Sequence, residues 1–287
     1  MAEAAIDDVE PAPWRRGLSW IWRRRNLALG AILVGVILLS AIFAPLIAHI
    51  APDAQDLAST LMPPDGAHLF GTDAYGRDLF ARVIFGARIS LLEIFLGVGI
   101  AVCVGVPLGL VSGTVGGPLD QAIMWLMDIV FAFPGVVLAI LIVSVLGANL
   151  LNMLFAIAVF SVPIYARLSR NLAMGIKRME YVEAATALGA GVPRLILDHI
   201  LRNALGPVIV QATLTAGTVV LTAASLSFLG LGAPPPLPEW GAMISDGREF
   251  IGVALWVSLF PGLAVTVTVL GFNMLGDGLR DLLDPRR

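Results

Sequence analysis

The sequence predicts an all-α integral membrane protein with six transmembrane helices. Of its 287 residues, 58% are hydrophobic and 14% are charged, and the mean hydropathy is +0.89. A typical soluble domain has about 25% charged residues, so this composition indicates a chain that lies mostly in lipid. Cys103 is the only cysteine, which excludes a disulfide within the chain and a cysteine-based metal site.

Six apolar segments account for the predicted helices. They cover residues 27–49, 89–113, 121–147, 150–168, 204–229 and 251–275. The 23 residues of the first would rise about 34 Å as a helix, enough to cross a hydrocarbon core of about 30 Å. This segment is also too long for the apolar core of a signal peptide, so we expect it to be retained. The fifth is the weakest, because four threonines between 213 and 222 thin it. Without it, five spans would put the two termini on opposite sides.

Lysine and arginine predict the orientation. Fourteen of the 18 precede the first segment, flank the connection between the fourth and fifth, or follow the sixth. The other four are Arg77, Arg82, Arg88 and Arg248. The positive-inside rule then places both termini in the cytoplasm. The expected organisation is a cytoplasmic segment 1–26, a first span 27–49, an extracytoplasmic loop 50–88, a core of five spans 89–275 and a cytoplasmic tail 276–287.

Proline and small residues predict how the spans bend and pack. Each span contains one proline, at positions 45, 107, 134, 163, 207 and 261, so we expect bent helices, whether through ordinary tolerance of proline or through a role in gating. The second span also has a small residue at every fourth position: Gly97, Ala101, Gly105, Gly109 and Gly113. Such a stripe predicts close packing against another helix.

Acidic side chains are scarce inside the predicted spans. Asp128 lies in the third, eight residues after Asp120 and on roughly the same face. It either accepts hydrogen bonds from a neighbouring helix or lines a solute pathway. Glu93 lies near the outer end of the second span, where we expect it to reach the membrane interface.

The sequence contains no recognisable catalytic motif. Lys177 is the only lysine and follows isoleucine, so there is no Gly-Lys-Ser/Thr phosphate-binding loop. The three histidines, His49, His68 and His199, are far apart, and neither His-Glu-x-x-His nor Gly-x-Ser-x-Gly occurs. We therefore expect no enzyme activity, metal or cofactor in this chain. Active transport would draw energy from an ion gradient or a partner.

Two outer loops and one inner loop carry distinctive patterns. Residues 77–89, RDLFARVIFGARI, predict a helix lying along the outer membrane surface. The proline-rich stretch 233–241, APPPLPEWG, either meets a solute-binding protein or caps the pathway, or it is a rigid linker with an aromatic anchor. EYVEAATALGAG at 180–191 predicts a short helix and a sharp turn, too short and polar to span a membrane.

That inner loop carries a family resemblance. Glu183-Ala184-Ala185, Gly189 and His199-Ile200-Leu201 match the cytoplasmic "EAA" loop of ABC importer permeases. Further matches are GTDAYGRD at 71–78, AFP at 132–134, LSFLGLG at 226–232, EWG at 239–241 and GDGLRDLLDPR at 276–286. Together they resemble the second ("C"-type) inner-membrane permease of the dipeptide, oligopeptide and nickel group. One departure is Arg202, where the family usually has proline.

The resemblance implies a type I ABC importer permease fold in a bacterial cytoplasmic membrane. Its partners would be membrane lipid, a homologous second permease, two ATPase subunits that bind ATP and Mg²⁺, and an extracytoplasmic solute-binding protein; no nucleic acid is expected. The loop at about 172–203 would couple to an ATPase through Glu183, Ala184, Ala185, Gly189, His199, Ile200 and Leu201. Asp128 is a possible pathway residue, and Glu239 and Trp240 are possible docking residues for the binding protein.

The expected substrate is a di- or oligopeptide, with nickel, opines or glutathione as alternatives. An ion-driven secondary transporter is the alternative class, which would require internal repeats and buried ion ligands.

Overall fold

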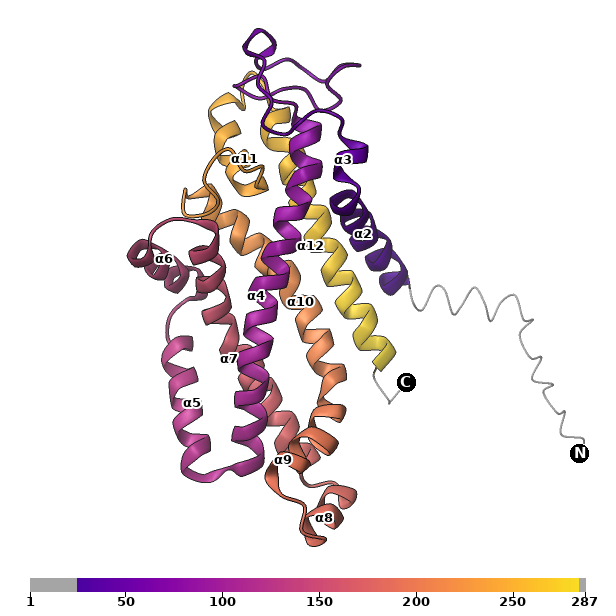
Figure 1. Ribbon diagram of the computed structural model, residues 1–287, viewed down its shortest axis with the longest axis vertical. Coiled ribbons are helices and arrows are strands. Elements are labelled where there is room, and N and C mark those ends of the chain that lie inside the picture. The colour runs from indigo at the N-terminus through magenta and orange to yellow at the C-terminus, as the bar shows by residue number, and fades with distance from the viewer. Residues whose placement is uncertain (1–24, 284–287) are drawn as a thin grey trace, which may run out of the picture.

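The computed structural model describes residues 25–283, and the elements named there are all helices (Figure 1). The N-terminal arginines at 15, 16, 23 and 24 and the C-terminal Arg286 and Arg287, used to predict orientation, lie outside these residues. The elements in order are α2 (Arg25–Ile42), α3 (Ala44–Ile47), η1 (Leu57–Ser59), α4 (Leu79–Val115), α5 (Gly117–Phe131), α6 (Gly135–Leu146), α7 (Leu150–Ile176), α8 (Glu180–Ala187), α9 (Val192–Arg194), η2 (Leu195–Ile200), α10 (Leu201–Phe228), α11 (Trp240–Gly247), η3 (Arg248–Phe250) and α12 (Trp256–Leu283).

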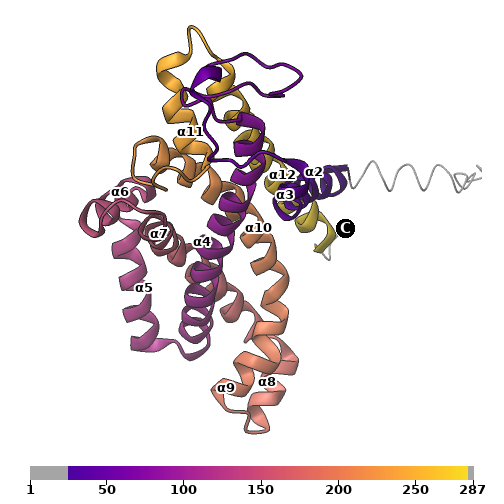
Figure 2. The same ribbon diagram turned by 45° about the horizontal axis from the view of Figure 1, so that its top comes forward.

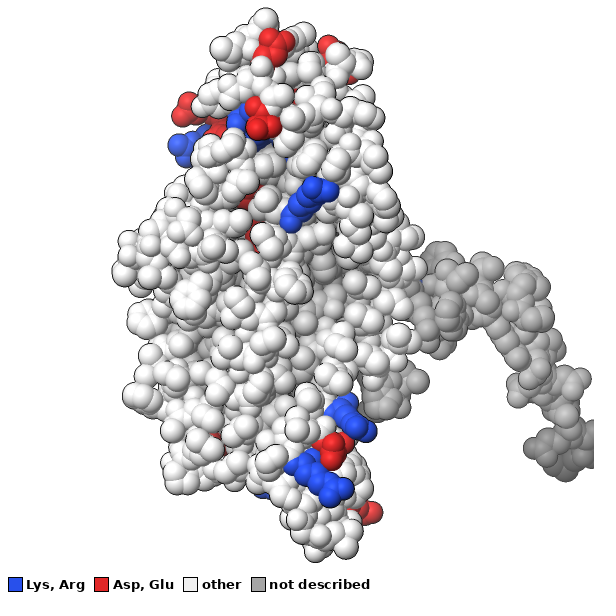
Figure 3. Space-filling model, in the orientation of Figure 1, with Lys and Arg blue, Asp and Glu red and all other residues white. Residues whose placement is uncertain are grey.

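Long apolar helices form the body of the molecule. In the described residues α2, α4, α7, α12 and the continuous stretch Val192–Phe228 are each long and apolar enough to cross a membrane. The helices α5 and α6 reach that length only together, and they meet at 85°. The predicted span 121–147 is therefore two helices, which meet at a sharp bend beside Pro134. Residues 25–283 thus contain five candidate spans, or six if the bent pair is one. Figure 3 shows charged side chains gathered at the two ends of the face drawn, with an almost uncharged band between.

The glycine stripe packs α4 against α7, as predicted. A Cβ atom at Gly105 would lie 2.6 Å from the Val162 carbonyl oxygen, and one at Gly109 would lie closer still to the carbonyl of Ala166. Only glycine therefore lets the two backbones approach this closely. The contact holds α7 in place, and α7 is the helix that leads into α8.

The prediction of a surface helix at 77–89 is wrong, because most of these residues are the first turns of α4. The helix runs without interruption for 37 residues, about 55 Å, so it extends beyond a hydrocarbon core. Arg82 is only 2% exposed, and its Nη1 donates to the carbonyl oxygen of Pro52 at 3.0 Å. The arginine therefore ties the loop before α4 to this helix and does not face lipid headgroups.

The GTDAYGRD stretch folds into a compact start for α4. Asp73 accepts hydrogen bonds from the Nε of Arg77 at 2.6 Å and from the backbone of Tyr75 at 2.8 Å. Asp78 caps the helix by accepting from the backbone nitrogen of Ala81 at 2.7 Å. These contacts give the stretch a structural role at the loop-to-helix junction.

Candidate functional site

The predicted short helix is present as α8, which hangs from the end of the bundle between α7 and α9 (Figures 1 and 2). Val182 is completely buried and anchors it to the core. Glu183 and Ala184 are exposed, and Leu188, just after the helix, is 89% exposed. Ala185 is half-buried. One face of α8 therefore holds the helix in place, and the other is open to a partner.

A hydrogen-bonded turn ends α8. The backbone nitrogen of Gly189 donates to the carbonyl of Thr186 at 2.9 Å, and that of Ala190 donates to Ala185 at 3.0 Å. This is the Schellman arrangement, which places its central residue in the left-handed region. Gly189 has φ +87°, as glycine permits. Pro193 then lies in the first turn of α9, where its missing N–H costs nothing.

Residues 199–203, after the turn, contact α8 and hold it in place. Ile200 is completely buried in the core at the end of a π-helical turn, η2. The side-chain nitrogen of Asn203 donates to the Tyr181 hydroxyl at 3.0 Å and to the His199 carbonyl at 2.6 Å. The rings of Tyr181 and His199 are 6.1 Å apart. Leu201 is half-buried and begins α10, so this part of the loop connects α8 to a long helix. Sequence reasoning missed Tyr181 and Asn203, which no motif marks.

A hollow of about 610 Å³ adjoins α8. It is lined by Gly113, Met174, Lys177, Arg178, Glu183, Thr186 and Ala187. The Nζ of Lys177 donates to the Thr114 carbonyl at 2.6 Å, which joins the last turn of α4 to the end of α7. Because the hollow brings both charge signs beside the open face of α8, it suits a polar protein surface better than lipid.

Asp128 contacts a neighbouring helix. Its Oδ1 accepts from the Nη2 of Arg167 on α7 at 2.6 Å, and both side chains are exposed. Closer to the end of the same helices, Arg170 donates to Asp120 at 2.5 and 2.7 Å. Asp128 thus accepts a hydrogen bond from a neighbouring helix, which was the first of the two alternatives. Its role in a pathway stays a prediction.

Glu93, Glu239 and Trp240 are buried, each about 1% exposed. Glu93 therefore does not reach the membrane interface as expected, and its Oε1 has no hydrogen-bond partner among the described residues. Glu239 caps α11 by accepting from two backbone nitrogens, and burial raises the pKa of its carboxyl. The indole of Trp240 donates to the Val83 carbonyl at 3.0 Å. Docking of a binding protein through Glu239 and Trp240 stays untested, and both side chains are occupied inside the protein.

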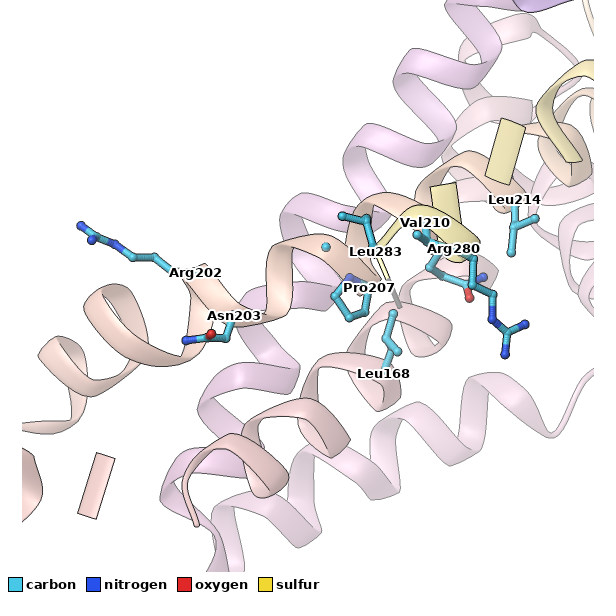
Figure 4. A pocket seen from close by; sticks show the side chains of 10 residues that line it. Leu168, Arg202, Asn203, Pro207, Val210, Leu214, Arg280 and Leu283 are labelled. Carbon is cyan, nitrogen blue, oxygen red and sulfur yellow. The ribbon is translucent and has the colours of Figure 1, made fainter. Parts of the chain in front are cut away.

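A second cavity, of about 730 Å³, lies between α7, α10 and α12 (Figure 4). Its lining includes Arg202 and Arg280 but no acidic residue. Figure 4 shows the two guanidinium groups pointing away from each other, from different helices. Arg202 lies in the first turn of α10, and the chain is helical from Val192 to Phe228 across it. The absence of proline therefore coincides with an unbroken entry into α10.

Comparisons with known proteins identify this combination of long helices and a projecting loop. Residues 105–287 match the binding-protein-dependent transport system inner membrane component, and residues 13–64 match the N-terminal transmembrane domain of oligopeptide transport permease C. The chain belongs to the inner-membrane permease family of binding-protein-dependent ABC importers. It is a permease of the C type, as the sequence predicted, and a multi-pass membrane protein.

The relatives cover nearly the whole chain. A dipeptide transport permease of Alkalihalophilus pseudofirmus is 46% identical over 96% of this chain and 90% of its own. A probable D,D-dipeptide permease of Escherichia coli K12 is 44% identical, covering 94% and 92%. A glutathione permease of Pectobacterium atrosepticum is 40% identical, covering 96% and 91%. The inward-facing methionine ABC transporter MetNI shares the fold, with TM-score 0.56 and 19% identity over 68% of this chain and 93% of its own.

Proposed function

We propose that this permease forms half of the translocation pathway of an importer for di- or oligopeptides. The relative named as a dipeptide permease, 46% identical over 96% of the chain, carries this proposal. The permease acts with a homologous permease, two ATPase subunits and an extracytoplasmic binding protein. ATP and Mg²⁺ bind to the ATPase subunits, and this chain hydrolyses nothing.

The open face of α8 is the proposed ATPase contact. Glu183 and Ala184 lie on that face, while Gly189 sets the exit turn. Ala185, His199, Ile200 and Leu201 hold the helix against the bundle, so movement of an ATPase subunit is passed on to α7 and α10. Because the glycine stripe of α4 packs closely against α7, α7 moves as a rigid helix together with α4.

Glutathione is the second candidate substrate, because a glutathione permease is also 40% identical over nearly the full chain. Nickel and opines stay alternatives predicted from the sequence resemblance. Membership of the ABC importer family replaces the alternative of an ion-driven secondary transporter. The bent α5–α6 pair supports counting six spans, and the basic residues support placing both termini and α8 in the cytoplasm of a bacterium.

Uptake by the reconstituted importer tests the proposed substrate. Proteoliposomes would contain both permeases and both ATPase subunits, with the binding protein and labelled dialanine outside and ATP inside. We expect ATP-dependent dialanine uptake that unlabelled dipeptides abolish. Uptake of glutathione without dialanine would replace the peptide proposal by the second candidate.

A further inference from the structure

The Arg167–Asp128 pair lies inside the helical bundle, away from the end that carries α8. Asp128 is 11 residues beyond Gly117, the first residue of α5, which corresponds to a rise of about 17 Å. Arg167 lies nine residues before Ile176, the last residue of α7, or about 14 Å from that end. Figure 1 shows these two helix ends on the same side of the bundle as α8. Both charged groups therefore lie about three turns of helix away from that end.

Both side chains of this pair are accessible. The side chain of Asp128 is 65% exposed and that of Arg167 is 42% exposed, although their charged atoms are 2.6 Å apart. By contrast, the Arg170–Asp120 pair near the helix ends is only 28% and 16% exposed. A charge exposed to lipid at the centre of a membrane helix costs at least about 2.5–3.5 kcal/mol, so charged residues within membrane helices face a water-filled cavity or another protein.

The Arg167–Asp128 pair also has unused hydrogen-bonding capacity. Of the guanidinium nitrogens of Arg167, only Nη2 donates to a described residue, and the face of the group lies 4.2 Å from the Phe131 ring centroid. The Oδ2 of Asp128 accepts from no described side chain. One cationic donor and one anionic acceptor are therefore presented side by side, which matches the two charged ends of a small peptide.

The chain around the pair is a broken helix. Three residues after Asp128, α5 ends at Phe131, and the backbone turns by 85° before α6. Carbonyl groups at the end of α5 carry partial negative charge, which favours an ammonium group there. Discontinuous helices near the midplane build the substrate sites of many transporters.

We propose that Arg167 and Asp128 form a substrate-binding pair in the translocation pathway, in which Arg167 receives the peptide carboxylate and Asp128 the peptide ammonium group. Their mutual ion pair holds both side chains in place between substrates. This inference rests on the proposed peptide-import function and adds Arg167 as a specificity-determining residue.

The test compares dialanine with its C-terminal amide in the complete reconstituted importer. For each variant, the ratio of acid to amide uptake is divided by the wild-type ratio, so that preferences of the binding protein cancel. We expect Arg167→Gln to lower this ratio about tenfold or more, because a charge-assisted hydrogen bond is lost, and Arg167→Lys to restore part of it. The matched control is Arg170→Gln, which breaks the neighbouring ion pair and should leave the ratio unchanged.

Water access gives a second measurement that does not depend on the binding protein. With Cys103 replaced by alanine, a cysteine at Asp128 should react with a charged thiol reagent, and dialanine import should slow the reaction. A cysteine at Ile32, which is 60% exposed on α2, should stay unreactive because lipid covers it. Failure of the Asp128 cysteine to react would overturn the pathway position.

The Arg167–Asp128 site and the proposed import function are overturned by different results. Normal wild-type dialanine uptake with an unchanged acid-to-amide ratio in Arg167→Gln would overturn the Arg167–Asp128 site alone. A wild-type importer that carries neither dialanine nor its amide would overturn the proposed function, and the peptide ligand of this pair with it.

Discussion

Replacing Gly189 by valine should uncouple this permease from its ATPase subunits. The glycine has φ +87°, and a left-handed conformation costs an L-residue about 1–2 kcal/mol, with a β-branched side chain at the upper end. No atom lies within 4 Å of the added Cβ, so the cost comes from the backbone and not from a collision. About 2 kcal/mol corresponds to a factor of about 30 between the formed and the unwound turn. Unwinding would release the two hydrogen bonds that end α8 and would misplace its open face.

Gly191 supplies the matched control two residues away. It has φ −71° and ψ 162°, which any residue adopts, and the nearest atom to an added Cβ is 3.9 Å away. We expect Gly191→Val to retain most uptake, and Gly189→Val to insert normally but lose it. The assay measures uptake, recovery of ATPase subunits with the purified permease, and their hydrolysis rate. Equal, near-wild-type uptake by the two variants at equal expression would refute the role of this turn.

Other predictions concern topology, packing and energy supply. In a cysteine-free background, single cysteines at Ser59 and Ala187 should be labelled from opposite sides of the membrane; labelling of both from outside sealed cells would contradict the proposed orientation. Gly109→Val should reduce the folded yield and melting temperature strongly, because its Cβ collides with the Ala166 carbonyl, whereas Gly99→Val, with no atom within 4 Å, should be mild; similar melting temperatures for both would count against the packing role. The chain purified alone should hydrolyse no ATP above background, and steady hydrolysis free of contaminants would oppose its assignment as a subunit.

Local sequence was sufficient for the features that depend on a few neighbouring residues. The helix of α8 follows from its alanines and its exit turn from Gly189, both within one short stretch. The contact between α4 and α7 follows from small residues at every fourth position. In each case the helical repeat, or the conformation of one residue, is enough to predict the structure.

Contacts between distant segments were not predictable in this way. The prolines at 107, 163, 207 and 261 lie inside continuous helices, whereas the one at 134 lies within the 85° break between α5 and α6, although all looked equivalent in the sequence. Arg82 contributed to the prediction of a surface helix, because its hydrogen-bond acceptor, the Pro52 carbonyl, lies 30 residues away in the sequence. Trp240 suggested a membrane anchor or a docking residue, yet its indole bonds a carbonyl 157 residues away. Asp128 was found as an isolated acid, and only folding brought Arg167 beside it.

Crosslinking from α8 would show whether this permease contacts an ATPase subunit through that helix. A photoreactive group would be attached to a cysteine at Leu188, which is 89% exposed, in the assembled importer lacking Cys103. Val253, 78% exposed just after η3, provides the control position. We expect a crosslink to an ATPase subunit from position 188 and none from position 253. Full ATP-driven uptake without any crosslink from position 188 would contradict an ATPase contact through α8.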